Sequence, residues 1–436
     1  SVWLDCSWLE DLQFEESQEL TLEDVEKIKA ASKDAWLERR MVTSICPSLY
    51  GLDHVKQAVL YQMLGGVDQY ARDGSYQRGF SSVLIIGDPS AGKTTLLMYV
   101  ARLVPRAHYS SGVSSSGKGL TALIGKDENG VMELRIGAVV MANGSICCLD
   151  ECEKARSDDR VALHECMETG KITVDKGGFN TQLNAHTAIL AAGNPVLGRY
   201  DPYKNITENI NLPVTLLSRF DLIFVIRDMP DPESDGKIVD RLLAAHRGLP
   251  LVEEGHDYYE HEFLRKYIMY ARRLKPKLTD EAAKQIKQIY LEIRKKSGNE
   301  DSPFTLATRQ GQALIRLAAA RAKLHLREEI LKEDVEAVWA LMNRSLQESG
   351  MDTETGKVDI DTIMTGTPTS ARSKMELILS TISELEKEHG EADELELYKH
   401  LQPQLTEYEI RDALFKLTRD GVLFNPKPGY IKRAKF

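Results

Sequence analysis

The 436-residue sequence has no apolar stretch that approaches the roughly 20 residues of a membrane-spanning helix, and no secretory segment is visible. We therefore expect no membrane partner. Its six cysteines include no Cys-x-x-Cys pair, which favours reduced packing thiols in a cytosolic protein over disulfides or zinc ligands. An initiator Met is also lacking, because the chain opens with SVWLDCSW. We expect that an N-terminal part of the protein precedes this sequence.

An excess of positive charge is lacking as well. The formal net charge is −10, which argues against wholesale wrapping of nucleic acid. It leaves room for a few basic loops that project into a pore, because phosphate contact is local. The hydrophobic content of 42% and the charged content of 28% are those of an ordinary soluble protein, with chain enough for several domains.

A phosphate-binding loop is the strongest chemical signal that is present. Residues 83–94 read VLIIGDPSAGKT, an apolar strand run followed by Gly-x-x-x-x-Gly-Lys-Thr and then by the helical LLMYVARLV. Backbone N–H groups of such a loop wrap a phosphate, Lys93 reaches the β- and γ-phosphates, and Thr94 ligates Mg²⁺. A chance match in a Gly/Ser turn would not have strand, loop and helix in this order. The predicted nucleotide-binding residues are Asp88, Pro89, Ser90, Ala91, Gly92, Lys93, Thr94 and Thr95.

Carboxylates and an amide follow two further strand-like runs. GSICCLDE ends on Asp150, predicted to hold Mg²⁺, and Glu151, predicted to polarise the attacking water. An apolar run with Asp-Glu is common when it stands alone, and its distance from Lys93 strengthens the prediction. TAILAAGNP ends near Asn194, whose amide is suited to orient the same water. The alternative for Asn194 is an ordinary Asn-Pro turn.

Two arginines are candidates to complete the site. Arg219 in TLLSRFDLIF is placed to act as an arginine finger, a residue that neighbouring subunits often supply. The alternative is a salt bridge to Asp221 or to another carboxylate. Arg309 opens a predicted helix and could reach the same phosphates, although taken alone it is typical of a surface arginine.

Two segments predict β-hairpins. Residues 170–183 (GKITVDKGGFNTQL) predict a hairpin with Lys176 at its tip. The alternative to a functional lysine at the tip is a purely structural edge hairpin. Residues 124–134 (IGKDENGVMEL) predict a second, acidic hairpin that would move during the nucleotide cycle.

The chain changes character along its length. Residues 49–226 alternate apolar strand runs (SVLIIG, GSICCLD, TAILAAG, DLIFVI) with helices, which predicts a parallel α/β sheet. A capping box in TLEDVEKIKAAS starts an earlier helix. Beyond residue 257 the sequence predicts only helices, then a Gly/Thr/Asp-rich linker. The last 65 or so residues predict three helices and a hairpin, a winged helix, for which a protein-docking module is the alternative.

The ordered motifs GDPSAGKT, CLDECEKA, DRVALHECMETGKITV, LNAHTAILAAGNP, GRYDPYKNITENINLPVTLLSRFDLIF and TRQGQALIRLA closely resemble the minichromosome maintenance (MCM) replicative helicases of the AAA+ superfamily, archaeal members above all. The resemblance covers nearly the whole chain. It implies five parts: 1–20 remnant of an N-terminal domain, 21–235 AAA+ α/β core, 236–348 helical lid, 349–371 linker and 372–436 winged helix. The fold class it implies is α/β, with a P-loop ATPase sheet, a small all-helical lid and a winged helix.

The resemblance also assigns roles. It implies Walker A at Lys93 and Thr94, Walker B at Asp150 and Glu151, sensor 1 at Asn194, the finger at Arg219, sensor 2 at Arg309 and the pore lysine at Lys176. In the family the two arginines act across a subunit interface, which implies a ring, usually a hexamer. The resemblance further implies that one Lys176 per subunit forms a collar around the pore and contacts DNA there. This chain departs from the family at Ser90–Thr94, which is closer to the generic P-loop. It also has Leu134–Gly137 where the family commonly has Leu-Glu-Ala-Gly, so no role is carried over to that glutamate.

The leading hypothesis is therefore an ATP-dependent DNA helicase motor that uses ATP and Mg²⁺ as cofactors. Its expected partners are single-stranded DNA in the pore, further copies of itself and other replication proteins. The expected location is the nucleoid if the chain is archaeal and the nucleus if it is eukaryotic. The alternatives are a chelatase-like AAA+ remodeler that acts on protein and a non-hydrolysing, nucleotide-gated DNA-binding paralogue.

Overall fold

The computed structural model describes residues 20–349 and 377–433 with internal gaps. The residues left out within those ranges are 71, 75, 113–119, 121, 127–131, 177–178, 197, 202–205, 228–230, 248–257, 297–303, 380, 384, 387–391, 402–404, 406–409, 412, 415–416, 419–422 and 425–429. The predicted N-terminal remnant and linker lie almost wholly outside the described residues. The chain divides into two compact units, Ser1–Ser349 and Gly350–Phe436.

A five-stranded parallel sheet forms the centre of the first unit. Its order is β11 (Leu222–Ile226), β3 (Val83–Gly87), β10 (Ala188–Gly193), β7 (Ile146–Asp150) and β4 (His108–Ser111). Every residue of β3, β7, β10 and β11 is buried, as the unbroken apolar runs predict for strands covered on both faces. The four strands predicted from sequence are confirmed, and β4 is an addition.

Helices cover the sheet. The helix α5 (Lys93–Leu103) packs on β7 and β10, α4 (Asp53–Leu64) packs on β3, and α14 (Lys332–Ser349) packs on β11. The other helices and turns of this part are α2 (Leu22–Ala31), α3 (Leu37–Ser44), α6 (Ala138–Met141), η1 (Cys152–Lys154), α7 (Ser157–Thr169), α8 (Ile206–Asn209) and α9 (Val214–Leu217). The predicted capping box of α2 is present, with reciprocal hydrogen bonds between Thr21 and Asp24.

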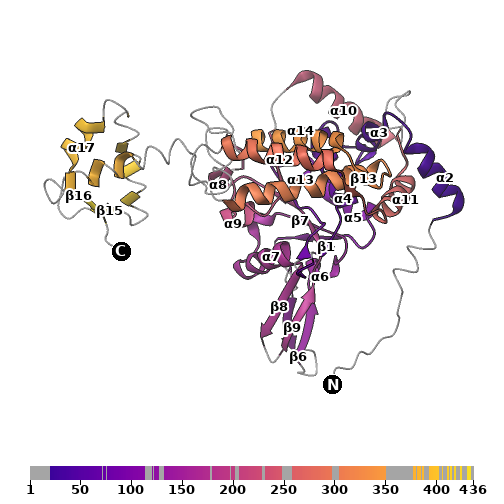
Figure 1. Ribbon diagram of the computed structural model, residues 1–436, viewed down its shortest axis with the longest axis horizontal. Coiled ribbons are helices and arrows are strands. Elements are labelled where there is room, and N and C mark those ends of the chain that lie inside the picture. The colour runs from indigo at the N-terminus through magenta and orange to yellow at the C-terminus, as the bar shows by residue number, and fades with distance from the viewer. Residues whose placement is uncertain are drawn as a thin grey trace. The chain divides into compact units, whose positions relative to one another are not determined.

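In the described part of the first unit, three antiparallel hairpins extend from this core. They are β1–β2 (Gln69–Tyr70 and Tyr76–Gln77), β5–β6 (Ala122–Lys126 and Met132–Ile136) and β8–β9 (Lys171–Lys176 and Phe179–Asn184). The second and third are the hairpins predicted from sequence, and their tips, 127–131 and 177–178, lie outside the described residues. Figure 1 shows β6, β8 and β9 projecting from the same side of the unit.

The rest of the first unit is mainly helical. It comprises α10 (Pro232–Arg247), α11 (His261–Arg272), α12 (Asp280–Lys296), α13 (Phe304–Leu324) and α14. The prediction of helices alone is wrong in one detail, because β12 (Lys277–Leu278) and β13 (Glu329–Ile330) form a short parallel pair. Helix α10 runs through the predicted boundary at residues 235 and 236, so that boundary stays a prediction.

The second unit has its own core of buried aliphatic side chains, among them Ile378, Leu397 and Ile431. Its strands β14 (Ala392–Asp393), β16 (Tyr430–Arg433) and β15 (Leu423–Phe424) form an antiparallel sheet in that order, and α17 (Glu394–Leu401) packs on β14. The predicted terminal hairpin is present as the β15–β16 pair. The winged-helix assignment stays a prediction. In neither unit is a described helix both long and apolar enough to cross a membrane.

Candidate active site

The phosphate loop joins β3 to α5 as the sequence predicts. Gly92 precedes the helix with φ +81° and Ser90 lies in the loop with φ 66°, so the backbone turns sharply before the helix N-terminus. The Lys93 Nζ donates hydrogen bonds of 2.7 Å to the carbonyls of Gly87 and Asp88. Burial lowers the pKa of Lys93, and the neighbouring Asp150, Asp88 and Glu153 oppose that shift. Lys93 is therefore a buried ammonium held within the loop that would receive phosphate.

Oxygen ligands meet at the start of α5. The Thr94 hydroxyl donates a 2.6 Å hydrogen bond to Asp150 Oδ2, and the Tyr109 hydroxyl donates a 3.0 Å bond to the same oxygen. Burial and the Asp150 charge raise the pKa of Tyr109 to about 12, so it remains a donor at neutral pH. A hydroxyl beside a single carboxylate, next to a phosphate loop, is the donor set that fits Mg²⁺. Thr94 and Asp150 would hold the ion.

Glu151 occupies a strained position directly after β7. Its φ of 50° lies in the left-handed region, and its backbone N–H donates a 2.9 Å bond to Asp150 Oδ1. The Glu151 carboxylate accepts bonds from Lys154 Nζ at 2.7 Å and from the Ser111 hydroxyl at 3.4 Å. The carboxylate is thus turned off the strand and is half-exposed. An ionised carboxylate has about four acceptor sites, so Glu151 can also accept a hydrogen bond from water.

Asn194 directly follows β10, and its amide Nδ2 lies 3.5 Å from Glu153 Oε1. The other oxygen, Glu153 Oε2, is buried and has no hydrogen-bond partner among the described residues. Because β3, β7 and β10 are parallel neighbours, their carboxyl ends lie at one edge of the sheet. This edge brings together Lys93, Thr94, Asp150, Glu151 and Asn194, as the sequence predicts.

The two predicted arginines contact residues outside the phosphate loop. Arg219 forms a 2.5 Å ion pair with Glu168 on α7, and its Nε donates a 3.4 Å bond to the His164 carbonyl. Arg309 donates a 3.1 Å bond to the Ser218 hydroxyl. Within the described part of the chain, neither guanidinium hydrogen-bonds to a residue of the phosphate loop. The intrachain salt bridge foreseen as an alternative for Arg219 is present, with Glu168 as its partner.

Asp221, which was named as an alternative salt-bridge partner of Arg219, pairs with other arginines. It forms a 2.5 Å ion pair with Arg316 of α13 and a 3.4 Å contact with Arg78. Arg309 belongs to α13 as well, but it lies in the second turn and does not open the helix, since α13 begins at Phe304. Asp221 therefore ties α13 to the loop that carries Arg219.

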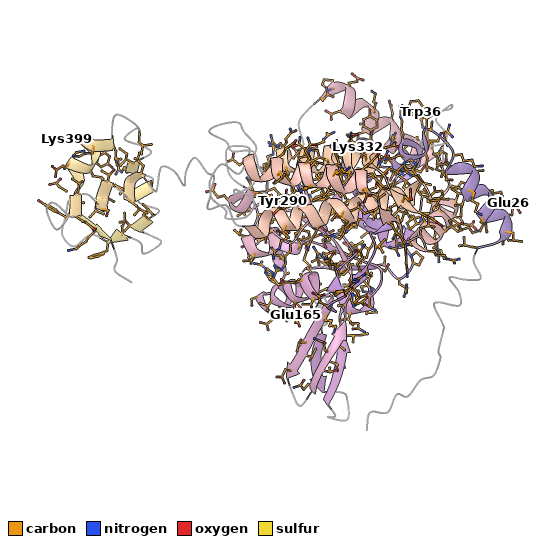
Figure 2. The ribbon with its side chains drawn as sticks, viewed as in Figure 1. Glu26, Trp36, Glu165, Tyr290, Lys332 and Lys399 are labelled. Carbon is orange, nitrogen blue, oxygen red and sulfur yellow. The ribbon has the colours of Figure 1, made fainter. Side chains whose placement is uncertain are left out.

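Lys176 is the last residue of β8 and pairs with Phe179 across the hairpin. The root of this hairpin is fixed by Glu165 of α7, which Figure 2 shows beside β8 and β9. The Glu165 carboxylate accepts a 2.5 Å bond from the Thr173 hydroxyl and 3.1 Å bonds from the Thr173 N–H. Helix α7 thus contacts both the hairpin, through Glu165, and Arg219, through Glu168.

Sequence reasoning missed several residues at this edge. Tyr109 and Ser111 come from β4, whose sequence HYSS has no apolar run to mark it as a strand. Glu153, two residues after Glu151, was not predicted either. Asp88 was predicted, but its partner was not: Asp88 Oδ1 accepts a 2.7 Å bond from the Tyr200 N–H.

Known proteins are similar to this chain over most of its length. A family model described as the MCM P-loop domain matches residues 24–246, and one described as the MCM AAA-lid domain matches residues 262–346. The chain is 40% identical over 416 residues to the minichromosome maintenance protein MCM of Saccharolobus solfataricus. The matched stretch covers 94% of this chain and 60% of that protein.

Eukaryotic relatives are similar too. The DNA replication licensing factor MCM4 of Arabidopsis thaliana is 36% identical over 428 residues, which cover 94% of this chain and 50% of that protein. The DNA replication licensing factor mcm-6 of Caenorhabditis briggsae is 38% identical over 328 residues, which cover 74% of this chain and 40% of that protein. The chain therefore spans about half the length of the curated relatives it matches.

Proposed function

The chain belongs to the minichromosome maintenance family, with the AAA+ P-loop fold of that family, and from this premise we propose that it is the motor part of an ATP-driven, ring-forming DNA helicase of replication. The observation that carries the proposal is a divided site. One edge of the sheet gathers Lys93, the Thr94–Asp150 pair and Glu151. Arg219 instead contacts α7, and Arg309 contacts Ser218. A neighbouring copy would supply the missing arginines.

The chemistry follows from the contacts of these side chains. Bound Mg²⁺ would neutralise charge on the β- and γ-phosphates. Lys93 would exchange its two loop carbonyls for phosphate oxygens, and the backbone N–H groups of residues 90–94 would surround them. Glu151 would accept a hydrogen bond from the attacking water, which Asn194 would orient. Arg219 of the next subunit would stabilise charge on the transferred phosphoryl group.

Family membership favours DNA over protein as the substrate, and the presence of Glu151, Asn194 and Arg219 disfavours a non-hydrolysing paralogue. The names of the relatives, which include DNA replication licensing factors, support a role in replication with other replication proteins as partners. We infer a hexameric ring around single-stranded DNA, in the nucleoid of an archaeal cell or the nucleus of a eukaryotic one.

Replacement of Lys176 by Ala tests the contact with DNA. We expect the Lys176→Ala variant to lose unwinding of a forked duplex and to keep most of its ATP hydrolysis, because a pore lysine contributes phosphate contact and leaves the nucleotide site intact. Both activities are measured on the same sample. Lys171→Ala, at the opposite end of the same strand, is the matched control. Equal unwinding by the Lys176→Ala variant and the unchanged protein would refute the DNA contact.

Glu165 offers a test of how hydrolysis drives the hairpin. We expect Glu165→Ala to keep ATP hydrolysis but to lower the base pairs opened per ATP, because three hydrogen bonds from Thr173 to the α7 carboxylate are lost. Thr173→Val removes the hydroxyl alone and should lower the same ratio less. In a double-mutant cycle the two losses should be less than additive, since both variants break one contact. Strict additivity would show that Glu165 acts on some other group.

A further inference from the structure

Residues 46–50 lie against the phosphate loop. A Cβ atom added to Gly92 would stand 2.3 Å from Leu49 Cδ1, so the Leu49 side chain fills the space beside that glycine. Gly92 directly precedes α5 and holds φ +81°. Any shift of Leu49 would therefore change the packing at the residue where the phosphate loop turns into its helix.

The backbone of this region is held in conformations that are unfavourable by themselves. Cys46 and Leu52, at either side, have φ values of 46° and 58°, both in the left-handed region. Non-glycine residues keep such conformations only where the surrounding structure fixes them. Residues 46–50 therefore need external contacts to stay in place.

Two cations supply those contacts. Lys56 of α4 donates from Nζ to the Leu49 carbonyl at 2.6 Å and to the Cys46 carbonyl at 3.2 Å. Arg241 of α10 donates from Nη1 to the Pro47 carbonyl at 2.8 Å and reaches the Leu49 carbonyl at 3.5 Å. The two side chains approach the same short segment from different helices.

Arg241 also contacts the aromatic side chain of the segment. Its guanidinium carbon lies 4.9 Å from the centre of the Tyr50 ring, a distance at which cation and ring attract each other. On the same helix the apolar side chains of Ile238, Val239 and Leu243 are 44–53% exposed. Arg241 thus turns toward the segment while apolar neighbours on α10 face solvent.

The Lys56 ammonium lies in a buried position, where a charged group needs hydrogen-bond partners. The residue is 2% exposed, and burial lowers the pKa of Lys56 to about 8. A buried ammonium is costly unless hydrogen bonds satisfy it, and here the acceptors are the carbonyls of residues 46 and 49. Lys56 is therefore held by specific hydrogen bonds and is not a solvated surface lysine.

We propose that Lys56 and Arg241 are positioning residues for nucleotide binding, which clamp residues 46–50 so that Leu49 supports Gly92 and the phosphate loop. This inference rests on the proposed binding of ATP at that loop. Neither cation is required to touch the nucleotide; each acts through the 46–50 segment. Because Arg241 belongs to α10, displacement of that helix would loosen the clamp and weaken nucleotide binding.

The test compares two buried lysines whose ammonium groups donate to carbonyls of different segments. Lys323 is 4% exposed, its pKa is likewise lowered to about 8 by burial, and its Nζ donates a 2.6 Å bond to the Gly66 carbonyl. We expect Lys56→Met and Lys323→Met to lower the unfolding temperature alike. Only Lys56→Met should weaken binding of a fluorescent ATP analogue with Mg²⁺, by about tenfold, because the phosphate loop loses its support.

A milder pair of variants on α10 covers the case in which Lys56→Met does not fold. Arg241→Gln should weaken binding of the same analogue about threefold, whereas Arg247→Gln, at an exposed position of the same helix, should leave it unchanged. Lys93→Ala gives the loss expected when the phosphate contact itself is removed. Unchanged affinity in both Lys56→Met and Arg241→Gln, or an equal loss in Lys323→Met, would overturn the inference. Failure of the unchanged chain to bind the analogue would instead overturn the proposed function.

Discussion

The Glu151→Gln variant is expected to bind ATP with unchanged affinity and to hydrolyse it about 10²- to 10³-fold more slowly. The amide keeps the shape of the side chain but cannot accept a proton from, or polarise, the attacking water. Binding depends on Lys93, Thr94 and Asp150, none of which is altered. Single-turnover hydrolysis and titration with a fluorescent ATP analogue measure the two quantities separately.

The position of Glu151 explains why replacing one of its carboxylate oxygens by an amide nitrogen is expected to have so large an effect. The residue follows β7 with φ 50°, and this backbone strain turns the carboxylate away from the strand. Strain of this kind is kept where the surrounding structure imposes it. Glu336→Gln, an exposed glutamate of α14 paired with Lys332, is the matched control and should hydrolyse ATP normally. Full hydrolysis by Glu151→Gln would assign the base to another group, and Glu153, with its unpaired Oε2, would be the next candidate.

The parts of the fold that could be predicted are those that sequence patterns describe locally. Continuous apolar runs predicted β3, β7, β10 and β11, because a strand covered on both faces needs apolar side chains throughout. The half-buried β4, His108–Ser111, has no such run and was missed. The β12–β13 pair was missed for another reason: two-residue strands depend on which segments the helices bring together.

The same limit applies to the site. Motif residues at strand ends were predicted correctly as neighbours, since carboxyl ends of adjacent parallel strands share an edge. Tyr109 on Asp150, and Glu168 on Arg219, depend on the order of strands and on the packing of α7, which no spacing in the sequence encodes. Lys56 also could not be predicted, because its partners are backbone carbonyls, and every residue has one.

A mixed-ring experiment tests whether the site is shared between subunits. We expect Arg219→Ala to lower ATP hydrolysis about 10³-fold or more in rings of a single variant, the loss typical of an arginine finger. Lys93→Ala should also be inactive, because the ammonium that binds phosphate is gone. Mixed one to one, the two inactive variants should regain activity, since about a quarter of the interfaces then combine an intact Lys93 with an intact Arg219 from the next subunit.

The regain of activity follows from the contacts of Arg219 in one subunit. Its guanidinium pairs with Glu168, outside the phosphate loop of its own chain, so Lys93→Ala leaves the finger of that chain in place. The control mixes Lys93→Ala with a chain that carries both substitutions, a mixture that contains no complete interface and should stay inactive. Light scattering with and without ATP shows whether rings form in each sample. Rings that form in the one-to-one mixture but remain inactive would mean that Arg219 serves its own subunit, and the proposal of a shared site would be wrong.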